Sequence, residues 1–137
     1  MGTTKIMKSH DNRINLINDT NISSVKFSID GKNIMFEFLD MIIGKPIFLL
    51  KCKQVYVFNY CNNFDEDEGL ACYVGEVSVE RFAKDNIEKQ FIKLGYNFTD
   101  LSGRICLPEA NNFCDINIAG GELSINVVCV EYELQKY

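Results

Sequence analysis

Histidine and tryptophan are the scarcest chemistry-bearing residues in this sequence. The 137 residues include one histidine, His10, and no tryptophan. A single imidazole argues against zinc centres and against iron sites built from two histidines and a carboxylate. A Ser-His-Asp or Cys-His catalytic group would depend on this one residue near the N-terminus. The sequence therefore predicts a protein that is not an enzyme and holds neither a metal nor a cofactor.

Positive charge is also in short supply. The chain has 14 Lys and Arg against 19 Asp and Glu, giving a net charge of −5 and a pI near 4.9. Nucleic-acid binding needs clustered cations, so this balance predicts no nucleic-acid partner. Glycine-rich phosphate-binding loops and the Gly-x-Ser-x-Gly nucleophile motif are absent as well.

Long apolar runs are missing, and the longest stretches, such as residues 47–50, are too short to cross a bilayer. The N-terminus lacks the apolar stretch of a secretory signal, so we expect a cytoplasmic protein without a membrane partner. No Cys-x-x-Cys pair occurs, and free thiols are the rule in a reducing compartment. We expect free, buried cysteines at all of the positions where this residue occurs, namely Cys52, Cys61, Cys72, Cys106, Cys114 and Cys129.

What the sequence does contain is alternating hydrophobicity typical of β-strands. Residues 25–29 and 34–38 alternate around Asp30 and Gly31, which predicts a hairpin. Two further strands are expected within residues 47–61, the first of them central in the sheet, and another over residues 71–82. Residues 113–119 and 122–134 flank Gly120 and Gly121 and predict a second hairpin.

Only one segment has a helical pattern. Asp85 and Glu88 resemble a capping box, and Gly95 is placed to end a short helix near residues 85–94. The first 20 residues are polar, and we expect them to be mobile or to add an edge strand through Ile14, Leu16 and Ile17. The fold class predicted is mainly β (α+β): a single domain over residues 1–137, sandwich-like or a curved antiparallel sheet.

The conspicuous polar feature is an acidic run that follows Phe64. Its four carboxylates can steer a basic partner, and we predict a partner-binding site there, composed of Phe64, Asp65, Glu66, Asp67, Glu68 and Glu76. A solvated loop without a partner is the competing interpretation. A calcium loop fits less well, because the glycine required at its sixth position is Leu70. Four other acidic residues on outward strand faces are weaker candidates for contact: Glu80, Glu122, Glu131 and Glu133.

Three segments of the chain resemble small β-rich bacterial proteins, some of which are immunity proteins of polymorphic toxin systems, including contact-dependent growth inhibition. They are residues 73–80 (YVGEVSVE), 94–96 (LGY) and 118–129 (IAGGELSINVVC), within a likeness over residues 24–134. The resemblance implies a protein that binds a cognate toxin domain and blocks its active site. An acidic inhibitor suits a nuclease toxin, whose nucleic-acid surface is basic.

These observations lead to one functional hypothesis and two alternatives. We expect a cytosolic binding protein that neutralises a cognate toxin by direct contact. The first alternative is a small-molecule-binding or accessory β domain with a pocket between its sheets. The second is a small hydrolase that uses two carboxylates facing one cleft. Pairing of exposed sheet edges into a homodimer stays open.

Overall fold

The structure is a computed structural model that describes residues 13–64, 71–86, 99–104 and 106–137. Its elements in chain order are η1 (Ile14–Ile17), β1 (Thr20–Phe27), β2 (Ile34–Asp40), β3 (Pro46–Asn62), β4 (Tyr73–Val74), β5 (Glu76–Ala83), η2 (Lys84–Asn86), β6 (Asn112–Ala119) and β7 (Leu123–Lys136). Both η elements are short 3-10 helices. No helix in the described part of the chain has the length and apolar character needed to cross a bilayer.

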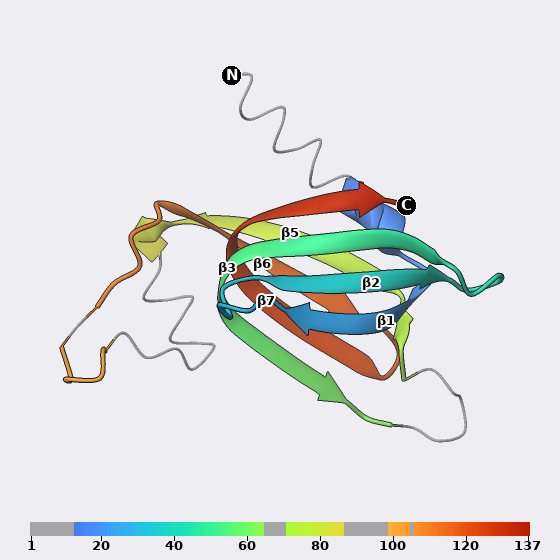
Figure 1. The fold of residues 1–137 in the computed structure, drawn as a ribbon, viewed down its shortest axis with the longest axis horizontal. Helices are drawn as coiled ribbons and strands as arrows, with labels where there is room; N and C mark the ends of the chain where they lie inside the picture. Colours follow the sequence, from blue (N-terminus) through green and yellow to red (C-terminus); the bar gives the residue numbers. More distant parts are fainter. Residues whose placement is uncertain (1–12, 65–70, 87–98, 105) are drawn as a thin grey trace.

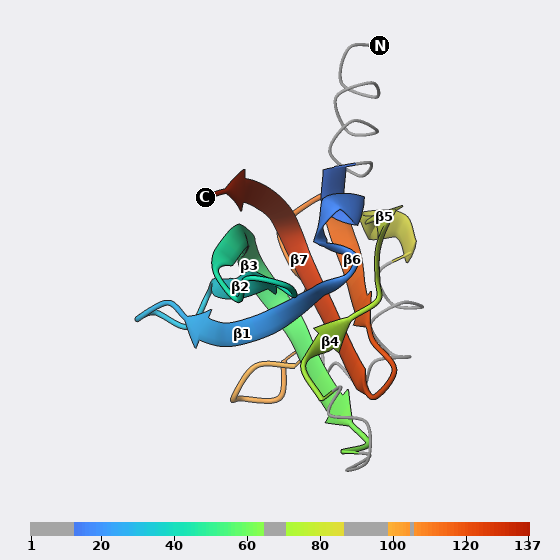
Figure 2. The same ribbon diagram turned by 90° about the vertical axis from the view of Figure 1, so that its right-hand side faces the viewer.

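All seven strands form one antiparallel sheet in the order β4-β1-β2-β3-β7-β6-β5, as the alternating pattern predicted. The sheet curves strongly, so that β1 and β2 lie in front of β6 and β7 (Figures 1 and 2). Its two edge strands, β4 and β5, are consecutive in the chain and are separated by Gly75 alone. The curvature therefore brings the two edges of the sheet together.

A short set of backbone contacts holds these edges in place. The Asp19 amide donates to the Val74 carbonyl over 2.8 Å, and the Gly75 amide donates to the Ala119 carbonyl over 2.9 Å. Gly120 lies against the Tyr73 backbone, where a Cβ atom at residue 120 would stand 2.9 Å from the Tyr73 carbonyl carbon and would overlap its oxygen. Glycine is the residue that permits this approach.

The main hydrophobic core lies on one face of the curved sheet, which we call the inner face. Its large, fully buried side chains include Phe36, Phe38, Leu50, Ile116 and Ile125. Ile14 and Ile17 of η1 pack into the same core with at most 1% of their surface exposed. The expected edge strand near residues 14–17 is therefore wrong, because a 3-10 turn places both isoleucines, three residues apart, on one side.

A smaller cluster lies on the opposite, outer face. Val57, Phe113 and Val128 are buried there beneath Ala110, which belongs to the connection between η2 and β6. The Phe113 ring stacks on Phe82 at 5.3 Å and meets Tyr56 edge-on at 5.7 Å. The sheet is thus covered on both faces at this end.

Both predicted hairpins are confirmed. In the first, β1 pairs with β2, and the Asp30 carboxylate accepts hydrogen bonds from the Ser28 hydroxyl and the Lys32 amide, while Gly31 adopts φ 75°. In the second, β6 pairs with β7 from Cys114 opposite Cys129 to Ala119 opposite Ser124. The first turn uses the positive φ that glycine allows, whereas the second has glycine at residue 120 because its backbone lies close to Tyr73.

Two expected boundaries change. The two strands expected within residues 47–61 are one strand of 17 residues, Pro46–Asn62, because Gln54 adopts φ 53° and a bulge between Val55 and Val57 lets the strand continue. That strand is fourth of seven in the sheet, so its predicted central place is confirmed. The strand predicted over residues 71–82 is interrupted at Gly75. Of the predicted helix near residues 85–94, the structure describes only the end of η2, and residues 87–94 lie outside the described residues.

Candidate functional site

The inner face of the sheet is open to solvent on one side, between β1 and the C-terminal half of β3. Val25 and Phe27 of β1 and Tyr60 of β3 turn toward the core side, yet 36%, 58% and 50% of their surfaces are exposed. The Phe27 ring meets Phe58 edge-on at 5.8 Å, and Phe58 in turn contacts buried Phe36 at 6.2 Å. We call the exposed set Val25, Phe27 and Tyr60 the core mouth.

A shallow pocket of about 270 Å³ opens at the core mouth. Ile22 and Tyr60 form its sides, and Leu123 and Ile125 at the start of β7 form its apolar floor. A bulge in β1 between Ile22 and Ser24 bends the strand at this point. The pocket has room for one apolar side chain of a partner, since it is smaller than most small-molecule sites.

The Asn62 side chain, at the end of β3, forms hydrogen bonds with three nearby residues. Its amide group donates to the Ala71 carbonyl over 2.7 Å and to the Tyr60 hydroxyl over 3.2 Å. Its side-chain oxygen accepts a hydrogen bond from the Phe64 amide over 2.9 Å. One side chain thus ties together the residues on both sides of the acidic run and the rim of the core mouth.

Phe64 is presented to solvent in an unusual backbone conformation. Its φ is 52°, a region that non-glycine residues seldom occupy, and 61% of its surface is exposed. Strained backbone conformations cluster at functional sites, so Phe64 remains a candidate contact residue.

The other predicted contact residues are placed as follows. Asp65, Glu66, Asp67 and Glu68 lie outside the described residues. Glu76 is exposed on β5 next to buried Val77, so it lies on the outer face and does not share a face with Tyr60.

Among the weaker candidates, Glu80 and Glu131 are exposed and Glu133 is half-buried. Glu122 is 8% exposed, because it sits in the turn at Gly120 and not on an outward strand face, so its expected position was wrong.

The carboxyl groups with shifted pKa values in the described part of the chain are turn and cross-strand acceptors. Hydrogen bonds lower the pKa of Asp30 and Asp100 through Ser28 and Ser102 respectively, and the amides of Ile43 and Ile42 lower that of Asp40. A general acid of a glycosidase needs a raised pKa instead. In the same residues, no group of three or more His, Cys, Asp or Glu side chains is arranged to hold a metal ion.

The six cysteines divide equally between interior and surface. Cys52, Cys114 and Cys129 are buried free thiols, as predicted, whereas exposure of the other three, Cys61, Cys72 and Cys106, contradicts the expectation that all are buried. The Arg81 guanidinium donates to the Cys114 sulfur over 3.0 Å and lies 5.5 Å from the centre of the Tyr132 ring. A hydrogen bond with Cys114 lowers the pKa of the Cys129 thiol, but contact with Cys52 and burial outweigh it and raise the pKa.

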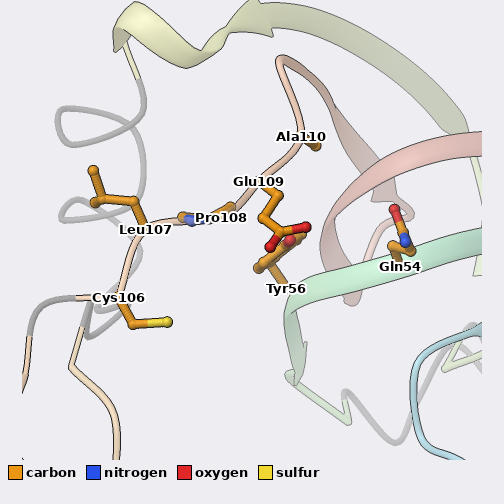
Figure 3. Close-up of a pocket in the computed structure, with 7 residues that line it drawn as sticks. All are labelled: Gln54, Tyr56, Cys106, Leu107, Pro108, Glu109 and Ala110. Carbon is orange, nitrogen blue, oxygen red and sulfur yellow. The ribbon is translucent and has the colours of Figure 1, made fainter.

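A second pocket, of about 500 Å³, lies beside the β3 bulge. Figure 3 shows Gln54 and Tyr56 of β3 on one side of it, with Cys106, Pro108 and Glu109 from the irregular segment on the other. Its volume is within the range of small-molecule sites.

Sequence reasoning missed the core mouth. Val25 and Phe27 have the same alternating pattern as the buried residues of β2, and nothing in the local sequence indicates that none of the described strands covers them. The one available signal was the uncharged stretch of residues 55–60, which has high β propensity and predicts that this strand is longer than β2.

The comparison with solved structures supports the fold. The crystal structure of an uncharacterized protein from Neisseria gonorrhoeae is similar, with a TM-score of 0.54 at 18% sequence identity, over 86% of this chain and 91% of that one. No curated protein matches. A family model with the description "-like" matches residues 15–136. Because that match spans nearly all of the sequence, the chain belongs to this "-like" family.

Proposed function

We propose that this protein is a non-enzymatic binding protein that neutralises a cognate bacterial toxin, of nuclease type, by direct contact in the cytosol of the producing cell. The observation that carries the proposal is the arrangement around Asn62. This side chain holds the Phe64 amide and the Ala71 carbonyl, on the two sides of a run of four carboxylic acids, and it also binds the Tyr60 hydroxyl at the core mouth. Aromatic anchors beside concentrated charge are the residues from which strong protein interfaces are built.

Anchors and charges have different tasks in this interface. Phe64 and Tyr60 offer apolar area at the surface, and the pocket of about 270 Å³ beside Tyr60 receives a side chain of the toxin. Burial of such rings sets the dissociation rate, since it supplies most of the binding free energy. The carboxylates of residues 65–68 attract the basic substrate-binding surface of a nuclease and raise the association rate.

The first experiment is co-expression with the product of the gene immediately upstream, followed by co-purification and a growth assay. A stable complex that rescues cells from a toxic C-terminal domain is the expected result. If that gene product is neither toxic nor bound, the toxin-neutralising role is wrong.

Surface charge is tested by a quadruple variant, Asp65→Ser, Glu66→Ser, Asp67→Ser and Glu68→Ser. We expect an association rate about tenfold lower at low salt and a flatter dependence on salt. The matched control removes four exposed carboxylates that are not candidates for contact, by Asp30→Asn, Asp85→Asn, Asp100→Asn and Glu109→Ser, and changes the net charge equally. Equal effects of both variants would show that only total charge matters.

The apolar anchor is tested by Phe64→Asn, because asparagine tolerates positive φ and so removes the ring while keeping the backbone. We expect affinity to fall about tenfold or more through faster dissociation, the usual effect of truncating an anchor. An unchanged dissociation rate would remove Phe64 from the interface.

Small-molecule binding is a second candidate function, favoured by the pocket of about 500 Å³ beside Gln54 and Tyr56. Native mass spectrometry of protein purified from its own cells would detect a retained ligand. A ligand lost in a Tyr56→Ala variant would support this function, and protein without bound mass would count against it.

A further inference from the structure

β3 extends well past the strand that pairs with it. β2 pairs with β3 only as far as Cys52, whereas β7 pairs with β3 through Asn62. From Phe58 to Asn62, none of the described strands pairs with the other side of β3. In Figures 1 and 2 no described strand runs alongside the side of this segment that faces away from β7.

This open edge lacks the features that normally protect one. The open edge and its flanks, residues 56–64, contain no charged residue and no proline, and they are rich in aromatic side chains. Exposed edges in stable proteins usually carry lysine, proline or inward-pointing charges that prevent further pairing. The edge strand β5 follows that rule, since it carries exposed Glu76 and Glu80. An uncharged edge with high β propensity is a template for another strand.

We propose that a second copy of this chain covers the edge, with the two β3 strands pairing antiparallel across a twofold axis. Identical strands are complementary to each other in this arrangement, because a twofold axis sets each residue opposite a residue on the same face. Two chains of net charge −5 repel each other in general, but the nine uncharged residues from 56 to 64 contribute no repulsion where the strands meet.

The register centred on Asn59 fits the side chains best. It sets Phe58 of each copy opposite Tyr60 of the other, on the inner face, and sets the exposed Asn59 residues opposite each other on the outer face. Aromatic cross-strand pairs stabilise antiparallel sheets. The 50% of Tyr60 that is exposed, and Phe27 beside Phe58, lie where the added strand covers them. This inference does not depend on the proposed toxin.

The first test is the mass of the full chain in solution, by sedimentation equilibrium over a concentration range. We expect a species of twice 15.7 kDa that dissociates on dilution. A monomer at every concentration up to about millimolar, the weakest binding of interest, would overturn the proposal.

The second test places charge on the edge. Asn59→Lys with Cys61→Lys sets like charges across the twofold axis, and we expect a dimer dissociation constant at least about tenfold higher. The control, Ser78→Lys with Gln135→Lys, adds the same charge at exposed positions of β5 and β7 away from the edge. Circular dichroism checks that both variants fold. A dimer that both variants weaken equally, or that neither weakens, would place the interface elsewhere.

The register is tested by Asn59→Cys in a chain whose exposed cysteines, Cys61, Cys72 and Cys106, are replaced by serine. An added oxidant takes two electrons and two protons from the two thiols, and we expect a covalent dimer in denaturing gels. Serine-background chains carrying Ser124→Cys should stay monomeric in that gel. A chain that is monomeric alone but loses a different protein partner through the lysine variant would show that the edge serves that protein and not a second copy.

Discussion

Replacing Gly120 with alanine tests whether the two edges of the sheet are held together at the turn between β6 and β7. The new Cβ atom, whose position the backbone fixes, would overlap the backbone carbonyl oxygen of Tyr73, so no side-chain rotation can relieve the overlap. β4 must therefore move away from the turn. That movement would break the hydrogen bond from the Gly75 amide to the Ala119 carbonyl.

The loss in the free energy of unfolding can be worked out from the contacts that this movement breaks. The Gly75 bond to Ala119 and the Gly120 bond to Leu123 contribute about 1 kcal/mol each. Val74 is fully buried in the core, and loosening its packing costs about 1 kcal/mol more, part of the transfer free energy of a valine. The free energy of unfolding should fall by about 3 kcal/mol, which lowers the melting temperature by about 10 °C in a chain of this size.

Urea unfolding followed by circular dichroism measures this change, with Gly31→Ala as the control. Residue 31 has open space around its Cβ position but adopts φ 75°, so alanine there costs about 1 kcal/mol of backbone strain and no clash. A Gly120→Ala variant that is as stable as Gly31→Ala would refute the close contact with Tyr73.

Three further predictions concern other parts of the molecule. The amides of Ile43 and Ile42 lower the pKa of Asp40 from its ordinary 3.8. The ionised carboxylate therefore stabilises the fold above that value, and this stabilisation is lost as the pH falls through the lowered pKa. Below about pH 4, the unfolding free energy of the Asp40→Asn variant should decline less than that of the native chain. Ellman's reagent should label Cys61, Cys72 and Cys106 rapidly and leave Cys52, Cys114 and Cys129 protected until the chain unfolds, and rapid labelling of more than three thiols in the native state would contradict their burial. Asn62→Ala removes three hydrogen bonds, and it should reduce the unfolding free energy by about 1 kcal/mol and speed proteolysis between residues 62 and 71. The control Asn59→Ala, at an exposed position, should do neither. Equal stability and equal proteolysis rates of the two variants would contradict the anchoring role of Asn62.

The elements that the sequence predicts well are those whose signals are local. The turn at Asp30 and Gly31 contains its own hydrogen-bond acceptor and its own residue with positive φ, so the hairpin could be recognised from a few residues. In β2, alternation from Ile34 to Phe38 matches the face that is buried. These features need no knowledge of distant parts of the chain.

The core mouth depends instead on how strands of unequal length meet. Phe27 alternates as regularly as Phe36, but it pairs with Ile34 at the start of β2, beyond which β3 continues with no described strand on that side. The length of β3 in turn depends on Gln54, a residue type that gives no sign of its positive φ. Burial of Glu122 is equally a matter of tertiary context, because the turn that carries it is packed against β4.

The pairing of β3 with β7 also has a consequence for how the chain reaches its native state during synthesis. β3 ends at Asn62, and β7, its longest partner, begins at Leu123 and runs almost to the last residue. While the ribosome is still translating the intervening segment, the uncharged stretch of β3 has emerged without that partner. Sheets dominated by such distant pairings fold slowly, and unpaired strands of this composition aggregate. Yield in the cell should therefore depend on translation speed and on chaperones, and a nascent chain that stops before residue 123 should be degraded or insoluble.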